Sequence, residues 1–240
     1  MKKSFLSRPF LPVAISFLAM NCLCAQSATN TAIIPEPRDD KWVARHEGFV
    51  KEAADSNPDV VFLGDSITDG WRSGGKKVWD ENFAPLHALN LGISGDRTQH
   101  VLWRIDHGEF DHVKPKVIVL MIGTNNTGKG RNSTAETIEG VTAVVKSLRS
   151  KVPGAKILLL GIFPRGEKDT PIRGELKEIN AAIAKLDDGK KVVYLDIGQK
   201  FLETDGTLSK EIMPDLLHPN KKGYRIWAEA IKPQLTSMLK

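Results

Sequence analysis

A serine and a histidine of the types found in hydrolytic sites stand near opposite ends of this 240-residue chain. Ser66 lies in the segment GDSIT, directly after an apolar run, and His218 lies in the segment DLLHP, three residues after Asp215. A carboxylate at that spacing can accept the proton on one imidazole nitrogen, so that the other nitrogen can take a serine proton. These residues predict nucleophilic catalysis, with Ser66 as nucleophile, His218 as base and Asp215 as the group that orients the base.

Both segments also have a purely structural interpretation. Ser66 could be only the N-cap of a helix, which is a common place for serine. An aspartate three residues before a histidine is weak support for catalysis when it stands alone. Pro219 suits the first turn of a final helix, so His218 could simply cap that helix while Asp215 is solvated. Further partners are needed before chemistry becomes the better interpretation.

Two more turns could supply those partners. A serine hydrolase needs donors aimed at the oxyanion of its tetrahedral intermediate, each worth about 3 kcal/mol in the transition state. Gly95 in GISGD would let its backbone N–H approach a ligand, and Asn125 in GTNN carries a side-chain amide donor. Glycine and asparagine are also ordinary turn formers, so it is the combination of segments that favours a catalytic site.

The rest of the chain predicts the elements that position these motifs. Short apolar runs, typical of strands buried on both faces of a parallel sheet, occupy Val60–Leu63, Ala88–Leu91, Val117–Ile122, Ile157–Leu160 and Val192–Leu195. Helical spacing of apolar residues occurs in Trp42–Ala54, Thr98–His107, Thr134–Lys151, Ile172–Leu186 and Asn220–Leu239. This alternation predicts an α/β protein of three layers, doubly wound and flavodoxin-like, with a five-stranded parallel sheet. Ligands of such sheets bind at the carboxyl ends of the strands.

The N-terminus has the pattern of an export signal. Residues 1–28 join a basic start, an apolar run from Phe10 to Met20 and small residues around Ala25, which predicts a signal peptide and a secreted or periplasmic protein. A membrane anchor is the alternative, but a spanning helix needs about 20 apolar residues, so no stable span is expected after cleavage. Residues 29–38 are polar, with two prolines, and are interpreted as a linker or strap; residues 39–240 form one domain.

Charge and cysteine content exclude several other classes of function. The chain has 34 basic and 29 acidic residues, and three of the basic ones lie in residues 1–28, which leaves a net charge of +2 on the rest. Without a basic stripe, nucleic acid is not expected as a partner. Both cysteines, Cys22 and Cys24, lie in the predicted signal peptide, so neither a cysteine nucleophile nor a thiolate metal site is expected in the domain.

With these four segments in order, the chain resembles the GDSL/SGNH hydrolases. The segments around Ser66, Gly95, Asn125 and His218 match the four signature blocks of that family in order. The segments PLHALNLGISGD, HVLWR and KPKVIVLMIGTNN are similar to the catalytic subunits of the intracellular platelet-activating-factor acetylhydrolases and their bacterial relatives. The likeness covers about residues 39–239; the chain departs from it in a longer segment around 73–77 and in its export signal.

The resemblance implies the roles of the site residues. Ser66 would be the nucleophile, the Ser66 and Gly95 N–H groups with the Asn125 side chain would form the oxyanion hole, and His218 and Asp215 would complete the triad. No cofactor or metal is implied, and a homodimer is possible by resemblance. The implied activity is hydrolysis of short-chain, most simply acetyl, esters of a small molecule or a carbohydrate. A lysophospholipase or thioesterase, or a non-catalytic carbohydrate-binding relative, is the alternative.

Neighbours of these residues would form the walls around the acyl group. Ile67, Thr124 and Leu217 are adjacent in sequence to the proposed active residues, and their bulk favours a short acyl chain. Acidic and histidine residues in 106–112 have the composition of a metal site, but they stand between a predicted helix and strand, away from the functional edge. Ser94 lacks the surroundings of a nucleophile elbow, and the glycines in 92–95 lack the spacing of a phosphate-binding loop.

Overall fold

The computed structural model describes Met1 and residues 29–240, so the predicted signal peptide, Met1 aside, lies outside the described residues. The strands are β1 (Val60–Gly64), β2 (Ala88–Gly92), β3 (Val117–Met121), β4 (Lys156–Leu160) and β5 (Val192–Leu195). They pair in parallel in the order β2-β1-β3-β4-β5, which is the flavodoxin-like order of a doubly wound sheet. The predicted fold class and the five predicted strands are confirmed.

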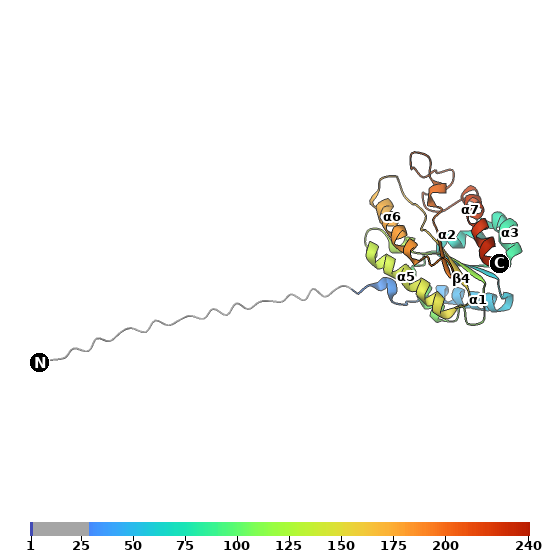
Figure 1. Cartoon of the computed structure of the whole chain (residues 1–240), viewed down its shortest axis with the longest axis horizontal. Helices are drawn as coiled ribbons and strands as arrows, with labels where there is room; N and C mark the ends of the chain where they lie inside the picture. The colour runs from blue at the N-terminus through green and yellow to red at the C-terminus, as the bar shows by residue number, and fades with distance from the viewer. Residues whose placement is uncertain (2–28) are drawn as a thin grey trace.

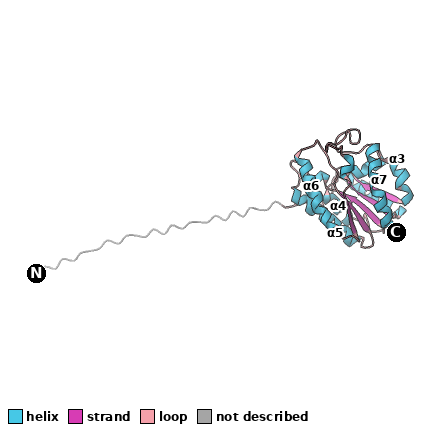
Figure 2. Cartoon of the chain, turned by 45° about the horizontal axis from the view of Figure 1, so that its top comes forward, coloured by secondary structure: helices cyan, strands magenta, loops and turns pink. Residues whose placement is uncertain are grey.

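Helices cover both faces of the sheet (Figures 1 and 2). The longer ones are α1 (Asp40–Ser56), α4 (Thr98–Asp106), α5 (Thr134–Lys151), α6 (Pro171–Ile183) and α7 (Lys221–Leu239), and the shorter ones are α2 (Ser66–Asp69) and α3 (Lys76–Asn82). Helices α1, α4, α5 and α6 pack on one face, and α3 and α7 on the other.

Alternation along each strand explains how one apolar run serves two cores. In β1, Val61 and Leu63 point into the core shared with α1, α4 and α5, whereas Val60 and Phe62 point into the core shared with α3 and α7. All five residues of β1 are buried. Because β1 lies between β2 and β3, the residues that follow these three strands meet at one edge of the sheet.

Residues 29–38 are docked on the domain. A short 3₁₀ helix, Thr31–Ile33, packs against α4 and α5 with Ala32 fully buried. The Thr98 hydroxyl donates to the Ala32 carbonyl at 2.7 Å, and the Glu36 N–H donates to the Gln99 carbonyl at 3.2 Å. This segment is therefore a strap across the surface, and we call residues 29–38 the strap below.

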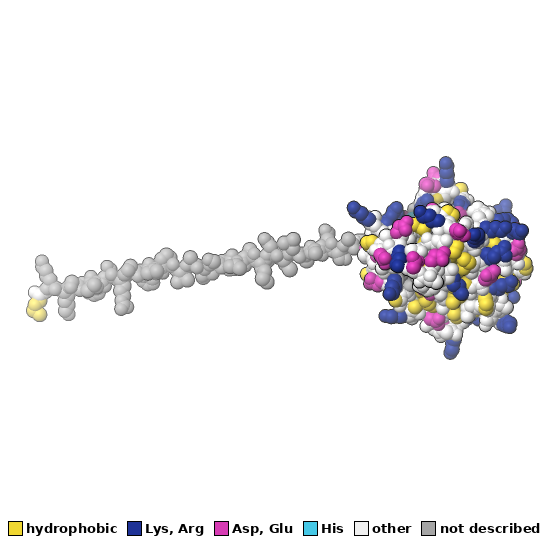
Figure 3. All heavy atoms as spheres, turned by 90° about the horizontal axis from the view of Figure 1, so that it is seen from above, with side chains coloured by type: hydrophobic (Ala, Val, Ile, Leu, Met, Phe, Trp, Pro, Cys, Tyr) yellow, Lys and Arg dark blue, Asp and Glu magenta, His cyan; other side chains and the backbone are white. Residues whose placement is uncertain are grey.

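Among the described residues, no helix is long and apolar enough to cross a membrane. Seen from above, basic and acidic side chains are interspersed over the visible face of the domain (Figure 3).

Candidate active site

Ser66 is the first residue of α2, directly after β1. Asp65, not Ser66, is the N-cap of this helix, because the Asp65 Oδ1 accepts a hydrogen bond from the Ile67 N–H at 3.0 Å. The sharp turn needs Gly64 beforehand, since a Cβ there would lie 2.3 Å from the Thr68 hydroxyl and 2.4 Å from the Met121 carbonyl oxygen. The capping interpretation of Ser66 is therefore wrong, and its hydroxyl is free for another contact.

That contact is with His218. The Ser66 Oγ lies 2.9 Å from the His218 Nε2, and the His218 Nδ1 lies 2.6 Å from the Asp215 Oδ2. The other carboxylate oxygen of Asp215 accepts from the His218 and Leu217 N–H groups, at 2.7 and 3.1 Å. One carboxylate thus fixes both the ring and the backbone of the histidine segment. An imidazole held this way can accept a serine proton on Nε2.

The environment of Asp215 keeps it ionised. Partial desolvation acts to raise the pKa of the Asp215 carboxyl, but hydrogen bonds from the His218 side chain and backbone outweigh it, so that this pKa is lowered. A carboxylate that stays charged to lower pH can stabilise the imidazolium that forms when His218 accepts a proton.

The two candidate oxyanion donors lie beside β1 on either side. Gly95 follows β2 with φ of +83°, and Asn125 follows β3 in a short 3₁₀ helix. The Asn125 amide nitrogen donates to the Asp96 carbonyl at 2.9 Å, which orients the amide and leaves its second N–H hydrogen for another acceptor. Within the described residues, the Gly95 N–H donates no hydrogen bond. Both groups can therefore serve a developing negative charge.

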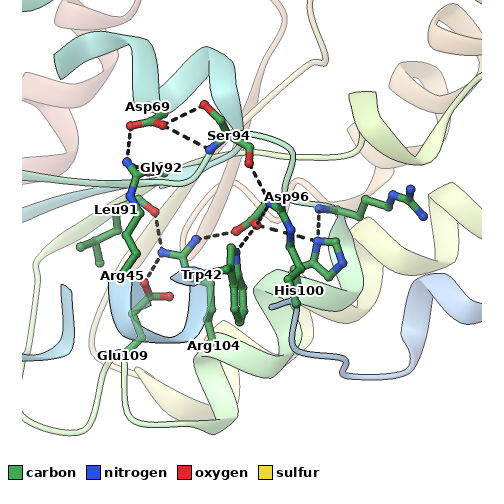
Figure 4. A network of polar contacts seen from close by, with 12 residues as sticks. Trp42, Arg45, Asp69, Leu91, Gly92, Ser94, Asp96, His100, Arg104 and Glu109 are labelled. Atoms are coloured by element: carbon green, nitrogen blue, oxygen red, sulfur yellow. Dashed lines mark hydrogen bonds and ion pairs between the residues drawn. The ribbon is translucent and has the colours of Figure 1, made fainter. Parts of the chain in front are cut away.

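The loop that carries Gly95 is held by a buried ionic network (Figure 4). The Asp96 carboxylate accepts from the Trp42 indole at 2.7 Å and from the Arg104 guanidinium at 2.9 Å, and both Asp96 and Arg104 are completely buried. Arg104 also pairs with Glu109 and donates to the Leu91 carbonyl. These contacts tie the loop after β2 to α1 and α4, so it cannot move independently of the core.

A second carboxyl group lies next to the nucleophile. Asp65 is 1% exposed, and this burial raises the pKa of its carboxyl to about 7, with the Asp96 charge acting in the same direction and the Ile67 N–H, His218 and Arg165 acting against it. Asp65 had no predicted role, because the candidate cap in the sequence was Ser66. The complete burial of Asp65 depends on how β1 sits in the sheet, which leaves no local signal.

A cavity of about 430 Å³ opens beside Ser66 and His218. Besides Ser66 and His218, the cavity is lined by four polar residues, two glycines, a proline and a tyrosine. They are Asp69, Gly70, Arg72, Ser73, Gly74, Ser94, Pro219 and Tyr224. Part of this wall comes from the segment around 73–77 at which the chain departs from the resembling family.

The three residues expected to wall the acyl group lie outside this lining. Ile67 and Thr124 are buried, 1% and 2% exposed, and Ile67 packs in the core with α3 and α7. Leu217 is half-buried and packs against the same core. Helical geometry explains the position of Ile67, because successive residues of α2 face different directions and Ser66 takes the outward one.

The residues in 106–112 point to separate partners. Glu109 pairs with Arg104, Asp111 pairs with Lys151, and the His107 ring stacks on Trp103 with centroids 3.8 Å apart. Among the described residues, no group of three or more histidine, cysteine or acidic side chains converges as a metal site would require.

Comparison with known proteins identifies the family of this chain. Residues 62–226 match the profile of the GDSL-like lipase/acylhydrolase family. The alpha2 subunit of platelet-activating factor acetylhydrolase IB from Rattus norvegicus is 40% identical over 215 residues, covering 87% of this chain and 90% of the relative. The human alpha1 subunit is 38% identical over 203 residues, covering 84% and 85%.

Solved structures share the fold at lower identity. A Bacteroides fragilis protein described as an acylhydrolase has a TM-score of 0.69 at 20% identity, covering 85% of this chain and 100% of that chain. A catalytic mutant of an acetylxylan esterase from Geobacillus stearothermophilus has a TM-score of 0.59 at 20% identity, covering 75% and 93%. From the family profile and the two relatives, the chain belongs to the GDSL-like lipase/acylhydrolase family and is a carboxylic ester hydrolase.

Proposed function

We propose that this enzyme hydrolyses short-chain esters, acetyl esters first, through Ser66, His218 and Asp215. The observation that carries the proposal is the continuous contact from Asp215 to His218 to Ser66, at 2.6 and 2.9 Å. The Ser66 oxygen attacks the ester carbonyl carbon while His218 takes the serine proton. The tetrahedral intermediate then collapses, its bond to the leaving oxygen breaks, and His218 returns the proton to the departing alcohol.

Water completes the cycle. His218 takes a proton from water, the resulting hydroxide attacks the acyl carbon, and the bond to the Ser66 oxygen breaks as the serine regains its proton. In both halves the oxyanion would accept hydrogen bonds from the Ser66 N–H, the Gly95 N–H and the Asn125 amide. The position of Ser66 at the first turn of α2 supports its part in this, because N–H groups there have no acceptor within the helix.

Tight packing around the nucleophile supports a short acyl group. Ile67 and Thr124 lie outside the cavity lining, but they are buried next to Ser66 and Asn125 in sequence and fill the core there, so they would leave no room for a longer chain on that side. Leu217 adjoins His218 and is half-buried, so it would act as a wall that a longer chain has to displace. Adding a methylene to a filled pocket costs about 1–3 kcal/mol, which favours acetyl.

Polar side chains in the wall of the 430 Å³ cavity support a hydrophilic leaving alcohol. Asp69, Arg72, Ser73 and Ser94 offer both donors and acceptors next to Ser66 and His218, as a sugar hydroxyl face requires. We therefore propose acetylated carbohydrate as the substrate class. The acetylxylan esterase of similar fold acts on such a substrate by its name, and the acetylhydrolase relatives share the acyl group.

The pattern of residues 1–28 supports export, so we place this reaction in the periplasm or outside the cell. The relatives are named as subunits of an acetylhydrolase, so we also propose that this chain associates in solution, as a homodimer. Size-exclusion chromatography with light scattering tests the homodimer. N-terminal sequencing of the protein recovered from the periplasm or medium tests export.

Ester hydrolysis tests the proposal directly. Ser66→Ala should lower kcat for 4-nitrophenyl acetate by about 10³ or more, with no change in melting temperature. Release of acetate from acetylated xylan should exceed release from a glycerophospholipid acetyl ester at equal acetyl concentration. Near-normal turnover by Ser66→Ala would refute the mechanism, and preference for the lipid would refute the carbohydrate assignment.

A further inference from the structure

Arg38, at the end of the strap, contacts the peptide group that joins Ser94 to Gly95. Its Nη1 donates a hydrogen bond of 2.7 Å to the Ser94 carbonyl oxygen. The same nitrogen would lie 3.1 Å from a Cβ built on Gly95, so the guanidinium lies directly against this peptide group. The Ser94 carbonyl and the Gly95 N–H are the two ends of one peptide bond.

We propose that Arg38 is a positioning residue, which aims and polarises the Gly95 N–H as an oxyanion donor. This inference rests on the proposed function, in which that N–H stabilises the tetrahedral intermediate. A trans peptide group is planar, and its C=O and N–H point in opposite directions. Fixing the Ser94 oxygen against a cation therefore fixes the direction of the Gly95 hydrogen.

Gly95 needs such a restraint. Its φ of +83° is available to glycine, which also adopts many other backbone conformations, so Gly95 itself does little to restrain the direction of the 94–95 peptide. The flanking residues are held by other contacts. Asp69 accepts from both the N–H and the hydroxyl of Ser94, at 3.2 and 2.8 Å, and Asp96 is anchored in the core (Figure 4). Arg38 restrains the peptide group between these two anchors.

Arg38 also acts on the strength of the donor. Hydrogen bonds with a charged partner are stronger than neutral ones, and a cation at the carbonyl oxygen draws electrons from the peptide nitrogen. The N–H at the other end becomes a better donor to an oxyanion. Arg38 lies 3.4 Å from Asp96, but that carboxylate already has Trp42 and Arg104 at shorter distances. The carbonyl of Ser94 is accordingly the main partner of Arg38.

The strap delivers Arg38 to this place through separate contacts. Besides the burial of Ala32, the Asn30 amide donates to the Glu139 carboxylate at 2.7 Å, and the Asn132 amide donates to the Thr31 hydroxyl at 2.9 Å. These contacts hold the strap but do not touch the Ser94–Gly95 peptide. They allow a control that loosens the strap while the guanidinium stays in place.

The experiment compares Arg38→Ala, Arg38→Lys and Asn30→Ala in the protein as expressed. Loss of a complete oxyanion donor costs about 10²–10³ in kcat, so a donor that is present but poorly aimed should cost about tenfold. Arg38→Ala should lower kcat for 4-nitrophenyl acetate by that factor with KM within twofold. Arg38→Lys should recover part of the loss, because an ammonium can also donate to the carbonyl, and Asn30→Ala should match the unmodified enzyme.

A trifluoromethyl ketone gives a readout that a structural role would not change. Its adduct with a serine carries an oxyanion, so its inhibition constant should rise in Arg38→Ala by the same factor as kcat falls. A change confined to KM, an unchanged inhibition constant, or an equal loss in Asn30→Ala would overturn the proposal. Loss of activity in Ser66→Ala, measured in parallel, separates these outcomes from failure of the proposed function itself.

Discussion

The Asn125 side chain donates a 2.9 Å hydrogen bond to the Asp96 carbonyl oxygen, and this bond joins the loops that follow β3 and β2. The two proposed oxyanion donors, Gly95 and Asn125, are thereby held in one unit across the end of β1. The bond uses one hydrogen of the amide and sets the direction of the other. A mobile amide would have to be reoriented in each cycle, whereas this one is fixed before substrate arrives.

Asn125→Ala should therefore lower kcat strongly while changing the melting temperature little. We expect a fall of about 10²–10³ in kcat, because a complete oxyanion donor is lost, and little change in KM for acetyl esters. The adjacent Asn126 provides a matched contrast. It is fully buried and bonds to Thr98, Gln99 and Asn132, so Asn126→Ala should lower the melting temperature instead. Steady-state kinetics and thermal unfolding of both variants check this, and a purely thermal effect of Asn125→Ala would contradict it.

Burial of Asp65 predicts a pH-dependent loss of stability. Its folded pKa of about 7 lies above its usual value of 3.8, so the folded state binds this proton more tightly than the unfolded chain. The stabilising contribution is complete below pH 3.8 and is lost as the pH rises through about 7. Asp65→Asn keeps the oxygen that caps Ile67 but cannot ionise.

The melting temperature of Asp65→Asn, relative to that of the unmodified protein, should accordingly be higher at pH 8 than at pH 5. Asp55→Asn is an exposed control and should show no such trend. If the difference between Asp65→Asn and the unmodified protein were constant over this range, Asp65 would not be the group that titrates.

Removal of the buried cation Arg104 should destabilise the protein strongly. Desolvation disfavours its charge, but Glu109 and Asp96 outweigh this and raise the pKa of Arg104, so it is a cation between two carboxylates. Arg104→Met leaves those carboxylates buried without their partner, which costs about 3–5 kcal/mol in other proteins. Urea unfolding at pH 7 measures the loss. The loss should be smaller at pH 5: burial raises the pKa of Glu109 to about 7 even though Arg104 acts to lower it, so removal of Arg104 raises this pKa further and Glu109 can be neutral in the variant at pH 5. An equal loss at both pH values would show that packing, not charge, is responsible.

The sequence was sufficient for the elements with a strong periodic pattern. The limits of α5 are Thr134 and Lys151, as predicted, because Ser133 and Glu136 form a capping box at its start. The short helix α3 was not predicted. Its seven residues offer less than two turns of pattern, and it is held by packing against α7, a contact between segments far apart in sequence.

The site was predictable where sequence neighbours make the contact and obscure where distant segments do. Asp215 and His218 are three residues apart, so their hydrogen bond follows from local geometry. The contact of Arg38 with Ser94 spans 56 residues and leaves no local signal. Adjacency also misled: Ile67 follows the nucleophile in sequence, but its side chain turns into the core instead of lining the open cavity.

Acyl-chain length provides the last prediction, because Leu217 is the one proposed wall that is not fully buried. Leu217→Ala should open space beside His218 and raise kcat/KM for butyryl relative to acetyl 4-nitrophenyl esters by about tenfold or more, because each methylene in a filled pocket costs about 1–3 kcal/mol. Leu216→Ala is the matched control, since Leu216 is also half-buried against the same core but is not adjacent to the histidine. The acyl-chain profile of Leu216→Ala should stay that of the unmodified enzyme, which should favour acetyl over butyryl and octanoyl.

An unmodified enzyme that prefers octanoyl would be a lipase or thioesterase in function. If Leu217→Ala kept the unmodified profile, with acetyl still preferred, the proposed reaction would stand but Leu217 would not be the residue that limits acyl length. The limit would then lie on the buried side, near Ile67 and Thr124.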